Sequence, residues 1–182
     1  MQVPSPPLVP LGGNLIWDPA QNITWYVPRY NPVAYVINWS QAVAWAAGLT
    51  IDNTTAGSWS LPSMPAVVSG ITESTGLIIY TDQGQMGYLC YDEGIWDLNT
   101  ASKGPFTNLE GEYWSSGEYE PGLYAWAFSF DDRIGTSTPE SIPLFALAVH
   151  PGELAPVPIP GAILLFVSGL LGFAVVRRKL KK

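Results

Sequence analysis

The chain has 182 residues, enough for one compact domain and a tail, and 47% of them are hydrophobic. Residues 1–156 carry 3 basic and 15 acidic side chains, a formal charge of −12, which excludes nucleic acid as a partner because phosphate binding needs a basic surface. The single cysteine, Cys90, excludes an internal disulfide, and Cys90 and His150 cannot form a Cys/His zinc site on their own.

Residues 1–13 form a Pro-rich amino-terminal segment, MQVPSPPLVPLGG. It has neither the basic n-region nor the apolar h-region of a secretory signal. Since the features described below indicate export, we expect the signal peptide to be missing from this sequence; the alternative is that the chain is not exported as given.

The body begins with a predicted strand-turn-strand unit over residues 15–26, where apolar and aromatic residues flank an Asp-Pro turn signal. One helix is predicted next, in NWSQAVAWAAGL, with Asn38 as N-cap, apolar residues at helical spacing from Trp39, and Gly48 as its stop. Five short strands are predicted to follow, over residues 76–80, 85–91, 113–116, 124–130 and 144–149. Most tryptophans are expected in the core, namely Trp17, Trp25, Trp59, Trp114 and Trp126.

These segments, in this order, resemble the DUF1566 or Lcl-carboxy-terminal family over residues 14–153. The resemblance implies an exported domain with an α+β fold, C-type-lectin-like or sulfatase-modifying-factor-like, with one main helix on short antiparallel strands, used mainly for extracellular binding. Ser60 and His150 stand where the family has arginines, so any contact those arginines make is made differently here. The segments that carry the resemblance are LIWDPAQNITW, NWSQAVAWAAGL, SWSLPS, EYWSSGEYEPGLYAWAFSF and ALAVHPGE, of which Tyr-Trp-Ser-Ser is the most specific.

The carboxy-terminal part reads as a sorting tail. A Pro-rich segment, residues 154–160, precedes a predicted transmembrane helix over residues 161–176, and residues 177–182 form a basic cytoplasmic tail. A buried core helix is the alternative for residues 161–176. Under the positive-inside rule the basic cluster keeps the carboxy end in the cytoplasm and places the body outside. This topology-setting cluster consists of Arg177, Arg178, Lys179, Lys181 and Lys182.

This tail resembles the PEP-CTERM class of bacterial sorting signals. Its proline motif is similar to the VPxPA-type variant and consists of Val157, Pro158, Ile159, Pro160 and Gly161. The resemblance implies processing by an exosortase, a membrane cysteine transpeptidase. It also implies contact of residues 161–176 with membrane lipid, a single-pass inner-membrane location before processing, and a cell-surface or extracellular-matrix location afterwards.

Candidate ligand contacts are few, and no enzyme motif is present. Trp96 lies in a predicted loop, DEGIWDLN, and is the candidate for an exposed carbohydrate or partner contact. Asp131 and Asp132 are the candidates in an acidic loop. With Glu110, Glu112, Glu118 and Glu120 they offer oxygen ligands for Ca²⁺, but no loop has the D-x-D-x-D-G spacing, so a solvated acidic loop is the simpler interpretation and no cofactor is expected.

The sequence therefore predicts a non-enzymatic, surface-sorted protein that binds exopolysaccharide or another envelope component. A membrane-anchored hydrolase with the same tail is the alternative, and a purely structural envelope protein is a third interpretation. A pocket with two convergent carboxylates or a bound metal would favour the hydrolase, whereas a shallow face lined by aromatic side chains would favour binding.

Overall fold

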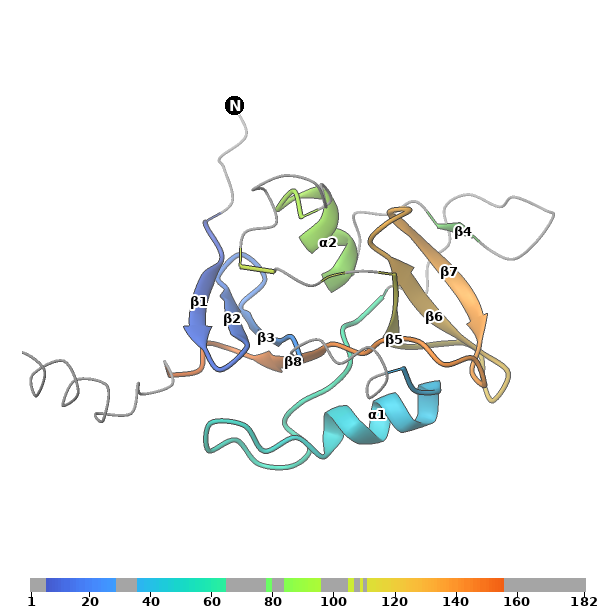
Figure 1. Ribbon diagram of the computed structural model, residues 1–182, viewed down its shortest axis with the longest axis horizontal. Helices are drawn as coiled ribbons and strands as arrows, with labels where there is room; N and C mark the ends of the chain where they lie inside the picture. The colour runs from blue at the N-terminus through green and yellow to red at the C-terminus, as the bar shows by residue number, and fades with distance from the viewer. Residues whose placement is uncertain are drawn as a thin grey trace, which may run out of the picture.

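The computed structural model describes residues 6–28, 36–64, 78–79, 84–95, 105–106, 109 and 111–155. These residues form two four-stranded antiparallel sheets and two short helices (Figure 1). The description below is confined to them.

The first sheet has the strand order β1-β2-β3-β8. Its strands are β1 (Val9–Gly12), β2 (Leu15–Asp18), β3 (Ile23–Tyr26) and β8 (Ala148–Pro151). Gly13 and Asn14 join β1 to β2, and both have positive φ angles, 59° and 70°, as a type I′ hairpin turn requires. The pairing of β2 with β3 confirms the strand-turn-strand unit predicted over residues 15–26.

The second sheet has the strand order β4-β7-β6-β5. Its strands are β4 (Ile78–Ile79), β7 (Ile134–Pro139), β6 (Tyr124–Ser129) and β5 (Glu112–Glu120). The central strand β6 is buried on both faces, with Trp126 and Phe128 in one apolar cluster and Ala125 and Ala127 in another. The strand predicted over residues 124–130 is confirmed, and β5 extends beyond the strand predicted over residues 113–116.

Helix α1 (Trp39–Ala47) forms where the sequence predicts it. Asn38 Oδ1 accepts a hydrogen bond from Gln41 N at 2.9 Å, and Gln41 Oε1 accepts one from Asn38 N at 3.2 Å. This reciprocal capping box satisfies two of the free N–H groups at the start of the helix. Gly48 follows as the C-cap, so both predicted ends are confirmed.

Helix α2 (Gln85–Tyr91) replaces the strand predicted over residues 85–91, so that prediction is wrong. Met86, Leu89 and Cys90 are each 0% exposed. Their spacing of i, i+3 and i+4 places them on one face of a helix, whereas a strand would have sent neighbouring residues to opposite faces.

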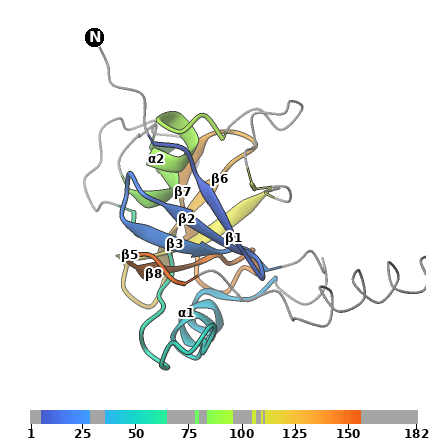
Figure 2. The same cartoon turned by 90° about the vertical axis from the view of Figure 1, so that its left-hand side faces the viewer.

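The two helices lie on opposite sides of the second sheet (Figures 1 and 2). Ala42 and Ala46 of α1 belong to the cluster that contains Trp114 and Ala127, whereas α2 packs with the cluster that contains Trp126. Of the tryptophans expected in the core, four are buried and Trp17 is half-buried; the four are Trp25, Trp59, Trp114 and Trp126.

The segment that follows Trp59 joins the two sheets at their edges. Ser60 N donates to Val149 O at 3.0 Å and Val149 N donates to Ser60 O at 2.8 Å, which covers the outer edge of β8. Ser116 N donates to Pro62 O at 2.9 Å, on the outer edge of β5. These bonds occupy backbone groups that an open edge strand would expose.

The predicted fold class is therefore corrected. A C-type-lectin-like or sulfatase-modifying-factor-like body was expected to carry one main helix on short strands, whereas the described residues are mostly β structure in two sheets, with helices of only 9 and 7 residues. Burial on both faces of β6 explains the difference, because each face of this sheet needs its own apolar layer. Only the coarse α+β description remains compatible.

The predicted single-pass inner-membrane location is corrected as well. No helix within the described residues is long and apolar enough to cross a membrane, since a crossing needs about 20 apolar residues. Residues 161–176, on which the prediction rested, lie outside the described residues.

Candidate functional site

Several of the predicted site residues lie outside the part of the chain that the structure describes. Their roles as carbohydrate contact, sorting motif and topology signal stay predictions from sequence. They are Trp96, the motif Val157, Pro158, Ile159, Pro160 and Gly161, and the cluster Arg177, Arg178, Lys179, Lys181 and Lys182.

Asp131 and Asp132 shape the turn between β6 and β7. Asp131 Oδ2 accepts a hydrogen bond from Gly111 N at 2.9 Å. Asp132 Oδ2 accepts one from Ser129 Oγ at 3.0 Å, and Asp132 N donates to the same Oγ at 3.1 Å. Both side chains are exposed, but these contacts give each carboxylate a role in the local backbone rather than in a binding cleft.

Of the acidic side chains proposed from sequence as calcium ligands, Glu110 lies outside the described residues, and the others are divided between the two ends of the second sheet. Glu112 begins β5 beside Asp132, and burial, followed by the charge of Asp132, raises the pKa of Glu112. Glu118 and Glu120 lie at the other end of β5, about 20 Å away at the usual rise per strand residue. No group of three or more His, Cys, Asp or Glu side chains that could hold a metal ion occurs within the described residues.

The Trp-Ser-Ser segment holds α1 against β5. Trp114 Nε1 on β5 donates to Ile37 O, just before α1, at 2.8 Å, and Trp39 Nε1 on α1 donates to Ser115 O on β5 at 2.9 Å. Ser115 is 0% exposed and its Oγ accepts a hydrogen bond from Gly117 N at 3.4 Å. The most specific motif of the sequence therefore has a structural role here.

A second buried polar cluster centres on Asp18, which is 0% exposed. Its carboxylate accepts hydrogen bonds from Gln21 N at 2.9 Å, from Gln21 Nε2 at 2.8 Å and from Trp25 Nε1 at 3.1 Å. Gln21 Nε2 also donates to Gln85 O at 3.2 Å, which links the β2–β3 turn to α2. Glu93 lies just beyond α2, and burial, followed by the charge of Asp18, raises the pKa of Glu93 to about 8.

This carboxyl pair does not have the geometry of a glycoside hydrolase. The two carboxyl groups of such enzymes face the substrate, whereas Asp18 is 0% exposed and its oxygens already accept hydrogen bonds from Gln21 and Trp25. Asp18 instead holds Gln21, whose side chain links the β2–β3 turn to α2.

Exposed apolar side chains gather at the free end of the β5–β6 hairpin. Here Pro-Gly forms the turn: Leu123 N donates to Glu120 O at 2.9 Å, and Gly122 has a φ of 78°, as the third residue of a type II turn requires. The segment after β7 lies beside this turn, since Glu140 N donates to Leu123 O at 3.0 Å. We define the tip patch by its exposed members Tyr119, Leu123, Tyr124 and Ile142, which are 42%, 61%, 37% and 43% exposed.

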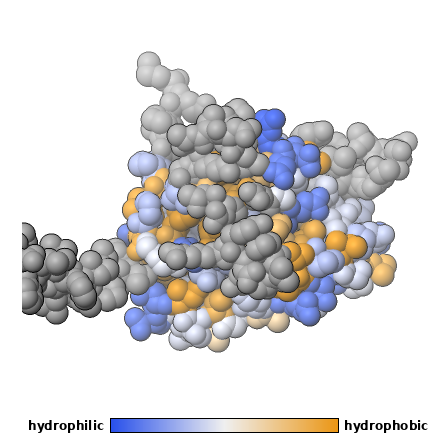
Figure 3. All heavy atoms as spheres, viewed as in Figure 1, coloured by the Kyte–Doolittle hydropathy of each residue, from blue (hydrophilic) through white to orange (hydrophobic). Residues whose placement is uncertain are grey.

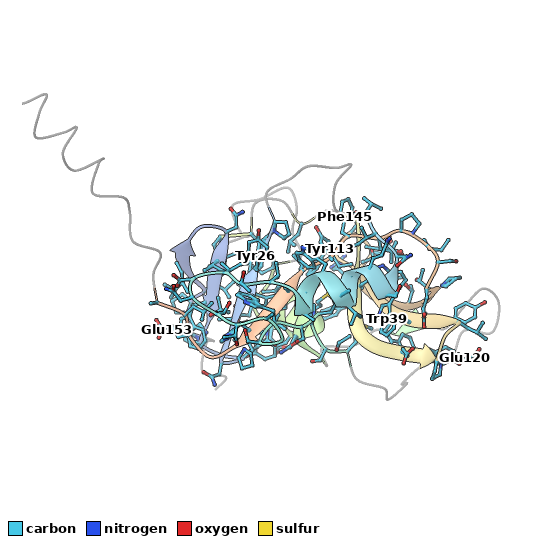
Figure 4. All side chains as sticks on the ribbon, turned by 90° about the horizontal axis from the view of Figure 1, so that it is seen from below. Tyr26, Trp39, Tyr113, Glu120, Phe145 and Glu153 are labelled. Carbon is cyan, nitrogen blue, oxygen red and sulfur yellow. The ribbon has the colours of Figure 1, made fainter. Side chains whose placement is uncertain are left out.

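Three carboxylates, Glu118, Glu120 and Glu140, surround the tip patch. Gly122 N is 3.4 Å from Glu118 Oε1 and 3.2 Å from Glu140 Oε1, so both carboxylates face the same turn. Figure 4 labels Glu120 at this end of the molecule, and Figure 3 shows hydrophobic beside hydrophilic surface there. Within the described residues the only Lys or Arg is Arg133, in the turn at the opposite end of β6.

The Tyr119 ring packs on the buried ring of Trp126. It meets Trp126 edge-on, with ring centroids 5.1 Å apart and planes inclined at 63°. Trp126 is 1% exposed and belongs to the main core cluster. An exposed aromatic ring is thus supported by the core, which fixes its orientation without burying it.

Comparison with known proteins gives no relative for this arrangement. No protein-family model matches the chain, no curated protein is similar to it, and no solved structure matches it. The resemblance to the DUF1566 family and to the PEP-CTERM tail therefore stays a prediction.

Proposed function

We propose that the protein is a non-enzymatic binding protein whose tip patch binds an extracellular polysaccharide without anionic groups. The observation that carries this proposal is the pair of exposed tyrosines, Tyr119 and Tyr124, beside a rigid Pro-Gly turn. Both flank the same hairpin, and Tyr119 is braced by the buried Trp126.

The chemistry of the tip patch suits a sugar ring. A tyrosine ring offers a flat apolar face for the C–H groups of a pyranose, and its hydroxyl can still hydrogen-bond to water or ligand. The carboxylates of Glu118, Glu120 and Glu140 are strong acceptors for sugar hydroxyl groups. Because β5 pairs with β6 and β6 pairs in turn with β7, little order has to be created on binding.

The charge of the tip decides which polysaccharides are excluded. Three carboxylates lie around the patch, and the basic side chain of Arg133 lies at the other end of the sheet. A polymer rich in uronate or sulfate groups would be repelled, whereas a neutral or amine-bearing polymer would not. Affinity electrophoresis against polymers of these three kinds tests the proposal, and retardation by the anionic polymers alone would overturn it.

Replacing both tyrosines, Tyr119→Ala with Tyr124→Ala, is expected to weaken binding by about tenfold or more, because each aromatic contact is worth about 0.5–1.5 kcal/mol. Isothermal titration with the retarding polymer measures the loss. Tyr91→Ala is the matched control, since Tyr91 is 39% exposed but lies on α2, away from the tip. Equal loss in the control and the double variant would contradict the proposal.

We further propose that binding needs no cation. At the tip, Glu118 and Glu140 accept from Gly122 N. At the other end of the sheet, Asp131 accepts from Gly111 N and Asp132 from Ser129 Oγ. Removing divalent cations with a chelator is therefore expected to leave the affinity for polysaccharide within about twofold, far below the tenfold step that corresponds to 1.4 kcal/mol. A larger loss that Ca²⁺ restores would show that a calcium site has been missed.

A further inference from the structure

Two carboxylates at the tip patch share one backbone donor. Gly122 N lies 3.2 Å from Glu140 Oε1 and 3.4 Å from Glu118 Oε1, so the two oxygens are no farther apart than these two distances added together. Glu118 belongs to β5 and Glu140 follows β7. The hydrogen bond from Glu140 N to Leu123 O at 3.0 Å holds the second segment beside the turn. The fold therefore brings two acidic side chains from distant segments to one point.

The charge at this point is unbalanced within the part of the chain that the structure describes. Two carboxylates repel each other at so short a separation, and a neutral N–H group that they share cannot offset two negative charges. Glu120 adds a third carboxylate to the same turn. Arg133, which is the only Lys or Arg among the described residues, lies in the turn at the opposite end of β6. A cationic group of a ligand would therefore be stabilised at the tip.

We propose that the tip patch selects a polysaccharide of amino sugars whose amino groups are free and protonated. This inference rests on the binding role proposed for the tip patch, and it narrows the ligand from any non-anionic polymer to a cationic one. A protonated amine has three N–H donors and no acceptor, so a single ammonium group can donate to Glu118 and to Glu140 at once. Such hydrogen bonds between ions are about twice as strong as those between neutral groups.

The aromatic side chains of the tip patch suit the same ligand. An amino sugar carries an apolar ring face and a cation within one small unit, as the hairpin carries tyrosine rings and carboxylates around one turn. Tyr119 and Tyr124 lie on either side of that turn and are 42% and 37% exposed. The face of a tyrosine ring attracts a cation as well as the C–H groups of a sugar. A protonated amino sugar thus uses both kinds of side chain, whereas a neutral sugar leaves the charge of the carboxylates unbalanced.

A basic peptide is the competing ligand, and the second sheet disfavours it. An extended peptide binds a sheet by adding a strand to a free edge. The outer edge of β5 is already bonded to other segments, since Trp114 N donates to Phe145 O and Ser116 N donates to Pro62 O, both at 2.9 Å. A peptide therefore cannot add a strand along this part of β5, whereas a sugar polymer needs only the side chains of the tip patch.

The test compares two hexasaccharides that differ only in their amino groups. The glucosamine hexamer carries free amines, and the N-acetylglucosamine hexamer has the same rings and linkages with each amine acetylated, which removes its charge. Isothermal titration at about pH 5.5 keeps the carboxylates ionised, since the ordinary pKa of glutamate is about 4.3, and keeps the amines protonated. We expect the free-amine hexamer to bind about tenfold more tightly at low salt, the combined effect of two or three exposed ion pairs. This difference should shrink as added salt screens the charges.

The double variant Glu118→Gln with Glu140→Gln identifies the carboxylates responsible. Glutamine keeps an oxygen that accepts from Gly122 N but has no charge. The turn should therefore remain, while the preference for the free-amine hexamer falls to about twofold or less.

Glu153→Gln is the matched control. Glu153 is exposed and follows β8, and Figure 4 shows it at the end of the molecule opposite Glu120. This variant removes the same charge as either tip variant, but it should keep the full preference for the free-amine hexamer.

The outcomes distinguish this inference from the function on which it rests. Equal binding of the two hexamers that Tyr119→Ala with Tyr124→Ala abolishes would overturn the selection for amines and leave polysaccharide binding at the tip in place. Binding of neither hexamer would overturn the selection for amines as well. So would a preference that survives in Glu118→Gln with Glu140→Gln. Tighter binding of a hexalysine peptide than of the free-amine hexamer, abolished by the same double glutamine variant, would overturn the inference in favour of a basic protein partner.

Discussion

Replacing Trp114 with alanine is expected to lower the free energy of unfolding by about 3–5 kcal/mol, the usual range for a large aromatic residue removed from a core. Trp114 is 0% exposed and packs from β5 into the apolar cluster that contains Ala42 and Ala46 of α1. Its Nε1 also donates the hydrogen bond to Ile37 O at 2.8 Å that fixes the chain just before the helix. The loss is a large part of the stability of a small domain, and urea denaturation measures it.

Trp114→Phe separates packing from hydrogen bonding in this prediction. Phenylalanine keeps most of the ring but has no N–H, so Ile37 O loses its donor and the expected loss is about 1–3 kcal/mol. If Trp114→Ala lowered the free energy of unfolding by no more than Trp114→Phe does, the conclusion that the Trp114 side chain packs against α1 would be wrong.

Replacing Asp18 with alanine is expected to lower the free energy of unfolding by about 2–4 kcal/mol, because removal of a buried acceptor leaves its donors unsatisfied. The donors are Trp25 Nε1 and two N–H groups of Gln21, at 2.8–3.1 Å. Thermal unfolding at pH 6 gives the size of the loss. Asp18→Asn should lower the free energy of unfolding by less, since the amide oxygen of asparagine can still accept hydrogen bonds.

The Asp18→Ala variant also tests whether Asp18 and Glu93 interact. In Asp18→Ala the charge that helps to raise the pKa of Glu93 is gone, so the effect of Glu93→Gln on the free energy of unfolding should be smaller in the Asp18→Ala protein than in the wild type. Full additivity of Asp18→Ala and Glu93→Gln would show that the two side chains do not interact.

Local signals in the sequence predicted the elements whose stability is local. The cap at Asn38 and the stop at Gly48 mark both ends of α1, and the Asp-Pro turn marks the β2–β3 hairpin. Helix α2 was mistaken for a strand because its aromatic and apolar residues resemble a buried strand, which short windows do not distinguish from a buried helix.

The arrangement of the two sheets could not be predicted from the sequence, for a different reason. The two sheets are joined by contacts between distant segments, such as Ser60 with Val149 and Ser116 with Pro62. Such pairings depend on the whole chain and leave no periodic signal in any one segment. The lectin-like expectation came from the order of motifs alone, and that order does not fix which strands are neighbours.

The tip patch was missed although its signal is present. The sequence around the turn reads Tyr119, Glu120, Pro121, Gly122, Leu123 and Tyr124, with tyrosines on both sides of a Pro-Gly turn. Attention to tryptophans as sugar platforms favoured Trp96 instead. What the sequence could not show is which aromatic rings are exposed, since Trp126 is buried two residues after the exposed Tyr124.

The central claim is that the tip patch binds polysaccharide, and a tyrosine-selective NMR titration tests it most directly. The protein is labelled at tyrosine ring positions and titrated with a neutral or amine-bearing polysaccharide. We expect the signals of Tyr119 and Tyr124 to shift in a saturable way while those of Tyr91 stay fixed. Saturable binding that leaves Tyr119 and Tyr124 unshifted, or the absence of any binding, would contradict the claim.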